Sequence, residues 1–374
     1  MSTERALSPD RRTFLRNAGL GVTAVGALFN PEAPAAQGSV SRPLTEAEKL
    51  SRLAMTCWPQ RHLFKTYGRG TPNEETQGLR KKYGEITMHD LPKWTKDFFP
   101  GVYHLDLWSD VFGDPADAAQ YTETTVERNG KPVTTRRWNP SAPASRQWVE
   151  KLASIIANEK FVCQHISNNA PQFLADPDDA RRQEGIRVAK VWMDLAAVLG
   201  AKTMRANTGT AIGRIMPEAE DHSTGYPKNE KIVVYLKKCI ESFKELADYG
   251  ARAGVKITIE NHWGLCANPM NIRIIMDEVN HPYCERTPDF CNWEHEYHLF
   301  HGLEAVMPYT HTHVHAKYWE RWKTPERDWN DVGRSVRILN AHRFKGTIAL
   351  EWENGPMNGI EGTKWLMKEV LAAL

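Results

Sequence analysis

Four side chains in the second half of the chain have the types and spacing of a metal site at the mouth of a barrel. They are Glu260 in TIENHWG, Asp289 in TPDFCNW, His315 in THTHVHAKYW and Glu351 in TIALEWENG. Each ends an apolar or β-branched run, and neighbours in the series stand about 30 residues apart, the length of one strand-plus-helix unit. Strand ends converge at one mouth of a (β/α)8 barrel. We therefore expect a mixed oxygen and nitrogen site for a divalent metal.

The two glutamates of this set can do more than hold a metal. Glu260 and Glu351 would end the fifth and eighth strands, so their side chains can meet across the mouth. One carboxylate can remove a proton from a substrate carbon and the other can return it from the opposite face, while the metal polarises a carbonyl. That chemistry is aldose–ketose isomerisation, or epimerisation beside a carbonyl, through an enediolate. The alternative is that both glutamates are ligands only.

Three histidines alternate along the predicted seventh strand. His311, His313 and His315 would point to the same side of the sheet, and only His315 would reach the mouth, with the other two beneath it. A His-x-His pair also occurs in barrel metal hydrolases, where it lies on the first strand. A metal-dependent hydrolase therefore stays open as an alternative.

The rest of the chain supplies the repeating elements that a barrel needs. Helical stretches at Gln183–Leu199 and Val233–Tyr249 each end at a glycine and lead into the next strand-like run. This alternation predicts a parallel sheet. No Pro/Gly/Ser-rich linker divides the chain after its N-terminal segment, so we predict a single (β/α)8 barrel. The eight predicted strands are Leu53–Cys57, Val102–Leu107, Phe161–His165, Thr203–Ala206, Lys256–Glu260, Arg286–Phe290, His311–Ala316 and Thr347–Glu351.

Two insertions follow predicted strands on the side of the mouth. Tyr121–Trp138 has β-branched runs around Asn129-Gly130, which predicts a β-hairpin after the second strand. Thr208–Asn229, after the fourth strand, is rich in glycine, proline and charge. Either insertion could cover the site, form an oligomer contact or be a plain surface loop.

The N-terminal segment has the pattern of an export signal. Asp10-Arg11-Arg12-Thr13-Phe14-Leu15-Arg16 precedes a mild apolar stretch and the small-residue sequence Ala33-Pro34-Ala35, as in a twin-arginine signal. We therefore predict a signal peptide and short linker over residues 1–38, a barrel domain over 39–374 and a periplasmic protein without membrane insertion. The six cysteines include no C-x-x-C pair, and Cys284 and Cys291 are the nearest pair for a disulfide. The net charge of +2 gives no electrostatic footprint for nucleic acid.

The motifs IENHWG, PDFCNW, HVHAK and ALEWENG, in this order, resemble the xylose isomerase-like barrel superfamily of sugar isomerases and epimerases. The resemblance covers roughly Leu44 to the C-terminus. It implies a (β/α)8 barrel and one divalent ion, commonly Mn, Mg, Co or Zn. It also implies that Glu260, Asp289, His315 and Glu351 are the ligands, with the two glutamates as the acid/base pair.

Other polar residues at strand ends are candidates for contacts with substrate. Lys317 fits the H-x-K form of the broader isomerase group, and Arg321 is a match for the arginine that ketose 3-epimerases have after the strand-seven histidine. Asn292 stands where those epimerases have a histidine, which is a departure. His262 lies two residues after Glu260 and should face the same side. The last two candidates, at the ends of the third and fourth strands, are His165 and Asn207.

These features predict a metal-dependent sugar isomerase or epimerase with a small sugar as its partner; a homo-oligomer is compatible with the sequence. A lyase or dehydratase acting on a keto-sugar, keto-glycoside or inosose shares the first proton abstraction, and only its products would differ. A carbohydrate-binding protein without catalysis is a further alternative.

Overall fold

The structure is a computed structural model that describes residues 42–68, 72–128, 131–209, 220–221, 226–227, 232–262, 264–293, 298–320 and 330–374. All of them except Arg42 and Pro43 fall in one folded unit, Leu44–Leu374. The predicted export signal, with Arg11 and Arg12, lies outside the described residues, and so does the predicted boundary between residues 38 and 39. No helix in these ranges is long and apolar enough to cross a membrane.

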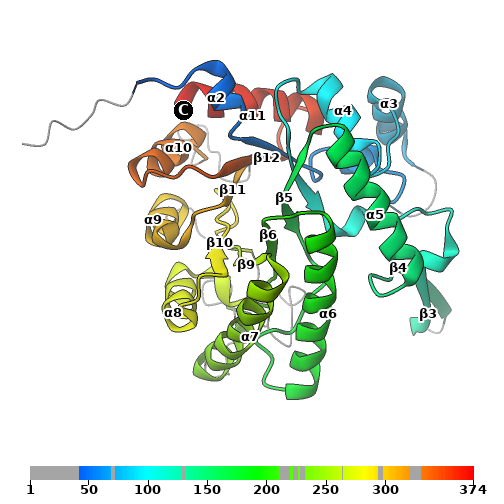
Figure 1. The fold of residues 1–374 in the computed structure, drawn as a ribbon, viewed down its shortest axis with the longest axis vertical. Helices are drawn as coiled ribbons and strands as arrows, with labels where there is room; N and C mark the ends of the chain where they lie inside the picture. The colour runs from blue at the N-terminus through cyan, green and yellow to red at the C-terminus, as the bar shows by residue number, and fades with distance from the viewer. Residues whose placement is uncertain are drawn as a thin grey trace, which may run out of the picture. The chain divides into compact units, whose positions relative to one another are not determined.

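Eight parallel strands form the centre of the fold, as predicted, with helices around them (Figure 1). Neighbouring strands follow the order β10-β9-β6-β5-β2-β1-β12-β11. Pairing between Asp289 and His315 joins the two ends of this series, because His315 N donates to Pro288 O at 2.9 Å and Phe290 N donates to His315 O at 3.1 Å. The strands are β1 (Leu53–Thr56), β2 (His104–Trp108), β5 (Val162–Ser167), β6 (Thr203–Arg205), β9 (Lys256–Ile259), β10 (Cys284–Arg286), β11 (His313–Trp319) and β12 (Thr347–Asn354).

Most strands are buried along their length, as expected where helices cover a parallel sheet. Two predictions differ from the structure. The sixth strand, β10, ends at Arg286 rather than Phe290, because Pro288 has no N–H to continue the ladder. The seventh strand, β11, begins at His313, so His311 precedes it and is exposed. The prediction that three histidines line one face is therefore wrong for His311.

Side-chain caps set the start of several helices. Asp178 accepts hydrogen bonds from Ala180 N and Arg181 N, so α6 begins a turn earlier than its apolar pattern suggested. The helices are α2 (Glu46–Leu50), α3 (Glu74–Tyr83), α4 (Leu91–Phe98), α5 (Pro143–Asn158), α6 (Asp179–Val198), α7 (Ile232–Ala253), α8 (Pro269–Val279), α9 (His298–Val306), α10 (Val332–Ala341) and α11 (Gly359–Ala373). Short 3-10 helices span Arg61–Leu63, Ser109–Val111, Ala118–Gln120, Leu265–Ala267 and Met307–Tyr309.

The predicted hairpin is present. β3 (Tyr121–Arg128) and β4 (Lys131–Trp138) pair antiparallel from Tyr121–Trp138 to Arg128–Lys131, and the hairpin projects beside α5 and α6 in Figure 1. Of the second insertion, the structure describes residues 208–209 and the short strands β7 (Glu220–Asp221) and β8 (Tyr226–Pro227). The remainder of that insertion lies outside the described residues.

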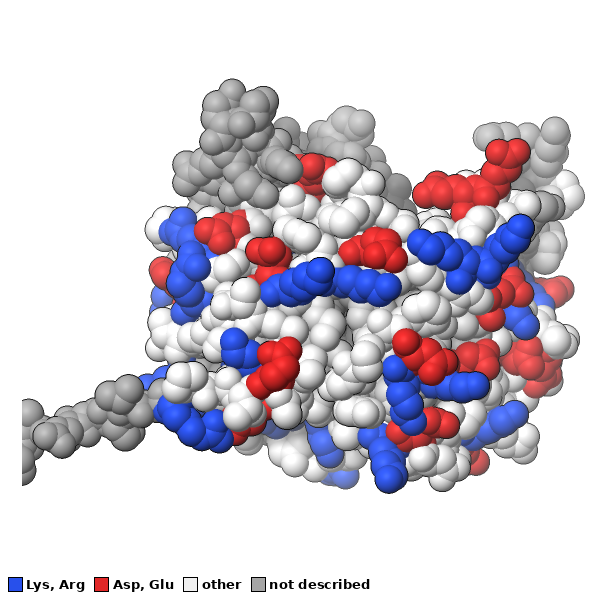
Figure 2. Space-filling model, turned by 90° about the horizontal axis from the view of Figure 1, so that it is seen from above, with Lys and Arg blue, Asp and Glu red and all other residues white. Residues whose placement is uncertain are grey.

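All six cysteines are buried free thiols. The candidate disulfide is absent from the described structure, because Cys284 Sγ lies 3.9 Å from Met276 Sδ and Cys291 Sγ donates to Lys317 O at 2.9 Å. On the face shown in Figure 2, basic side chains lie beside acidic ones.

Candidate active site

The barrel brings the four predicted metal-site residues together at the carboxyl ends of its strands. Glu260 and Asp289 follow β9 and β10, while His315 and Glu351 lie within β11 and β12. One ligand atom each from Glu260, Asp289 and His315 falls within 4.8 Å of the others. His315 Nδ1 lies 3.6 Å from Glu260 Oε2 and 3.3 Å from Glu351 Oε2. The geometry fits the proposed ligand set, while metal binding itself stays a prediction.

Hydrogen bonds from Asn261 and from its own loop fix the position of Asp289 and use only one of its two carboxylate oxygens. Asn261 accepts from Asp289 N at 2.8 Å and donates to Asp289 O at 2.9 Å. Asp289 Oδ1 accepts from the N–H groups of Cys291 at 2.6 Å and Asn292 at 2.8 Å. The fully buried Oδ2 has no hydrogen-bond partner among the described residues, and burial raises the pKa of Asp289 to about 8. An unpartnered buried carboxylate oxygen beside other carboxylates suits a hard divalent cation.

His315 is oriented from behind by Asp106 on β2. Its Nε2 lies 3.1 Å from Asp106 Oδ2, and Ser167 Oγ donates to Asp106 Oδ1 at 2.8 Å. A carboxylate at Nε2 favours a proton on that nitrogen, so Nδ1, which faces Glu260 and Glu351, is the nitrogen that would bind a metal once it has lost its proton. Burial opposes a positive charge on His315, but the carboxylates of Glu260 and Asp106 raise its pKa well above the usual value.

Glu260 has a buried cationic partner that the sequence analysis did not identify. Arg205, at the end of β6, makes an ion pair with Glu260, and both side chains are almost fully buried. Asn292 Nδ2 donates to Glu260 Oε1 at 3.0 Å. Burial opposes the charge of Glu260, but Arg205 and His315 lower its pKa well below the usual value. Glu260 is therefore ionised and available as a ligand or a base.

Glu351 is held by Lys317, a predicted substrate contact. Lys317 Nζ lies 3.0 Å from Glu351 Oε1 and 3.0 Å from Glu353 Oε2. Burial disfavours the charged ammonium, but Glu351, Asp289 and Glu353 raise the pKa of Lys317 well above its usual value. Lys317 thus places a permanent positive charge beside Glu351. The contribution of Glu353 was also missed by the sequence analysis.

A cavity of about 440 Å³ opens above these groups. Four predicted residues line it: Glu351, Lys317, His262 and Asn292. Lining residues that the sequence analysis did not assign to substrate are Trp58, Trp108, Asp110, Asn169, Arg205, Trp319 and Glu353. Indole faces beside charged groups suit a ligand with apolar C–H faces and many hydroxyls.

Three predicted substrate contacts are not in this lining. His165 is fully buried beneath it, with Nδ1 2.7 Å from Thr203 Oγ1 and its ring stacked on His313 at 4.7 Å. Asn207 is also buried and donates to Asn169 Oδ1 at 3.3 Å, so it reaches the cavity only through Asn169. Both residues lie behind the cavity wall, and a contact of either with substrate stays a prediction. Arg321 lies outside the described residues.

The sequences of β2 and β6 contain a signal for Asp106 and Arg205, which were not predicted as partners of site residues. Asp106 interrupts the apolar sequence HLDLW, and Arg205 ends TMR; a charged residue inside a buried strand needs a partner. The sequence did not indicate which residues those partners would be.

A comparison with known protein families identifies the family to which this chain belongs. The model of the xylose isomerase-like TIM barrel family matches residues 119–369. No curated protein matches the sequence significantly. The chain belongs to the xylose isomerase-like TIM barrel family.

Solved structures share the fold at low sequence identity. The apo 3-keto-D-glucoside 4-epimerase from E. coli is similar with a TM-score of 0.54 and 11% identity over 85% of this chain and 99% of that one. A xylose isomerase-like TIM barrel protein from Mycobacterium smegmatis in complex with magnesium has a TM-score of 0.51 and 15% identity over 78% and 92%. D-psicose 3-epimerase with D-tagatose from Clostridium cellulolyticum H10 has a TM-score of 0.51 and 13% identity over 86% and 96%.

Proposed function

We propose that this protein is a divalent-metal-dependent sugar isomerase or epimerase that transfers a proton at a carbon beside a carbonyl. One observation carries the proposal: the carboxylates of Glu260 and Glu351 approach the same ring nitrogen of His315, and each has its own buried cation. Membership of the family and the sugar epimerases among the structural neighbours support the substrate class.

Glu260, Asp289, His315 and Glu351 would hold the ion, which when bound polarises the carbonyl of the substrate. Arg205 keeps Glu260 ionised in the resting site, so its carboxylate is in the form that can accept a proton. Glu351 shares Lys317 with Glu353, so the ammonium partly offsets the negative charge of Glu351, which takes or returns a proton on the other side. His262 and Asn292 line the cavity beside Glu260 and are placed to bind hydroxyl groups.

A lyase or dehydratase is the second candidate, and Glu353 favours it. This carboxylate lines the cavity and lies 3.0 Å from Lys317 Nζ. An additional acid could protonate a leaving group after the proton abstraction, which isomerisation does not require. The products separate the two reactions, since an isomerase conserves mass and a lyase releases water or an aglycone.

The test is NMR of the purified protein in D2O with a panel of ketoses, aldoses and 3-keto-glycosides, first with Mn²⁺ and then with EDTA. Metal-dependent deuterium incorporation beside the carbonyl, with mass conserved, is the expected result. Metal-dependent loss of water or an aglycone would assign the lyase instead, and no exchange with metal bound would refute both reactions.

The Glu351→Gln variant tests the acid/base pair. Loss of a positioned acid or base should lower turnover by roughly 10²–10⁴-fold, while circular dichroism shows a folded protein. Glu369→Gln is the matched control, because Glu369 is exposed on α11 and lies outside the cavity. Unchanged turnover in Glu351→Gln would remove Glu351 from the chemistry.

A further inference from the structure

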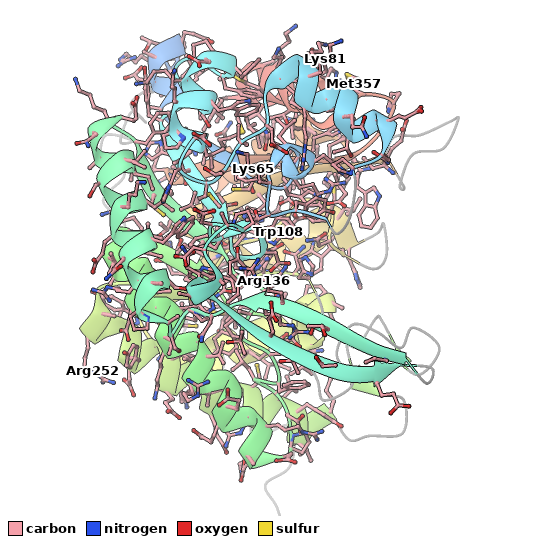
Figure 3. The ribbon with its side chains drawn as sticks, turned by 90° about the vertical axis from the view of Figure 1, so that its right-hand side faces the viewer. Lys65, Lys81, Trp108, Arg136, Arg252 and Met357 are labelled. Carbon is pink, nitrogen blue, oxygen red and sulfur yellow. The ribbon has the colours of Figure 1, made fainter. Side chains whose placement is uncertain are left out.

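A second and larger cavity continues from the candidate active site. Its volume is about 940 Å³, and it shares Trp108, Asp110 and Asn169 with the 440 Å³ cavity above the metal-site residues. Its other walls come from the base of the β3–β4 hairpin and from α6. Figure 3 shows Trp108 and Arg136 near each other where the hairpin leaves the barrel. The hairpin insertion therefore forms a wall of a space that opens into the site.

We propose that this second cavity is a subsite for the second ring of a disaccharide or glycoside, whose first ring carries the carbonyl and occupies the site above Glu260 and Glu351. This inference rests on the proposed function, and it narrows the substrate from free sugars to glycosides. The junction residues Trp108, Asp110 and Asn169 would then flank the glycosidic bond.

Aromatic side chains line both cavities and the junction between them. The ring of Trp108 lies 4.9 Å from that of Trp58 on the site side and 5.8 Å from that of Tyr67 on the far side. In the second cavity, Trp138 packs at 5.1 Å against Trp192. Sugar rings present apolar C–H faces that pack on such side chains, and aromatic residues in both cavities provide a face for each of two consecutive rings.

Polar side chains lie beside the aromatic residues of the cavities, at positions that suit hydrogen bonds to hydroxyl groups. Asn169 accepts from Arg205 Nη2 at 2.7 Å and its Nδ2 lies 3.4 Å from Asp110 Oδ2, so the junction is connected to the partner of Glu260. Farther out, the Arg136 guanidinium lies 4.0 Å from the Tyr121 ring centroid. Mixed aromatic and hydrogen-bonding walls suit the recognition of a glycosyl group.

The walls of the second cavity are fixed by close packing. Gly185 on α6 approaches the loop after β5 so closely that an added Cβ would lie 2.0 Å from Gln172 O. On the hairpin side, Trp138 Nε1 donates to Gln120 Oε1 at 3.2 Å. A preformed subsite can use the binding energy of a remote ring to align the reacting ring, which raises kcat/KM without new contacts at the metal.

The experiment compares 3-keto-cellobiose with 3-keto-glucose, which share the ring that carries the carbonyl. The readout is the ratio of their kcat/KM values in the Mn²⁺-loaded protein and in Val188→Trp, where an indole replaces a half-buried residue of the cavity wall on α6. Val234→Trp is the matched control, because Val234 is 45% exposed on α7 and does not line either cavity. We expect a ratio of roughly ten or more in the wild type, which corresponds to about 1.4 kcal/mol.

In Val188→Trp the ratio should fall toward one, and in Val234→Trp it should stay at the wild-type value. A ratio near one in the wild type, or an unchanged ratio in Val188→Trp, would overturn the subsite while leaving the proposed function intact. If neither keto-sugar reacts, the proposed function fails. In that case, binding of unreactive cellobiose, measured by tryptophan fluorescence, tests the subsite separately. Weaker binding in Val188→Trp than in the wild type would support the subsite. Absent binding, or binding that Val188→Trp leaves unchanged, would refute it.

Discussion

Replacement of Arg205 by methionine should destabilise the protein through the charge that remains on Glu260. Arg205 and Glu260 form a buried ion pair whose side chains are 5% and 1% exposed. Removing one partner of such a pair leaves an uncompensated buried charge, which costs about 3–5 kcal/mol. Methionine keeps the length and apolar volume of the arginine stem, so the charge is the main difference. We expect the free energy of unfolding of Arg205→Met to fall by roughly that amount at pH 7 in EDTA.

The pH dependence follows from the lowered pKa of Glu260. A carboxyl group whose pKa is lower in the folded than in the unfolded protein stabilises the fold above its unfolded-state pKa, which has a reference value of 4.5. This contribution is lost as the pH falls through the folded-state pKa. The difference in stability between wild type and Arg205→Met should therefore be full at pH 7 and should shrink on acidification below the reference value.

Guanidinium chloride unfolding, followed by circular dichroism at pH 7 and below pH ~4, measures these quantities. The double variant Arg205→Met/Glu260→Met is the control, since an apolar pair of similar volume recovers much of the lost stability. A loss of less than about 1 kcal/mol in Arg205→Met, the value of an exposed pair, would refute the reasoning. So would a double variant that is no more stable than the single one.

Two further predictions concern metal affinity and export. Asp106→Asn keeps the shape of the group behind His315 but removes the carboxylate that fixes the tautomer of His315. The affinity for Mn²⁺, measured by calorimetry, should therefore fall by roughly 10–100-fold. Unchanged affinity would show that Asp106 does not orient the ligand. Arg11 and Arg12 changed together to lysine should keep the protein in the cytoplasm if the N-terminus is a twin-arginine signal, and cell fractionation that still finds the protein in the periplasm would refute the export prediction.

The repeating part of this molecule was predictable because it depends on local patterns. Alternation of apolar runs and amphipathic stretches located the eight strands, and Asn129-Gly130 located the hairpin. The end of β10 was misplaced because Pro288 stops the ladder while Asp289 still pairs with β11. Asp289 still lies at the mouth although the end of β10 was misplaced, because the position of its side chain depends on the bridge to His315 rather than on the strand itself.

The partners of the site residues were not predictable, because they meet across the barrel from strands that are distant in sequence. Arg205 comes from β6 and Glu260 follows β9, and Asp106 on β2 reaches His315 on β11. The spacing of these residues along the sequence does not indicate which ion pairs form. His165 shows the converse: it ends a predicted strand, but β5 continues to Ser167, so the ring of His165 lies in the layer below, against His313.

The charge around the site leads to a last prediction about proton release. Five carboxylates face three permanent cations there, which leaves two negative charges. In the absence of metal, two groups have raised pKa values: Asp289, to about 8, and His315, well above its usual value. Two protons can therefore balance the charge that one divalent ion would balance. The carboxylates are Asp106, Glu260, Asp289, Glu351 and Glu353, and the cations are Arg205, Arg286 and Lys317.

Because ligands must lose their protons to bind a metal, Mn²⁺ binding at pH 7 should release about two protons per ion. Calorimetry in buffers with different ionisation enthalpies measures this number directly. Asp289→Asn cannot release a proton at that position, so the number should fall to about one. The sign follows from the raised pKa values: release should decrease as the pH rises above 8, where Asp289 is already ionised. Release near zero at pH 7 in the wild type would mean that the site is pre-ionised, and the charge balance derived from its buried residues would be wrong.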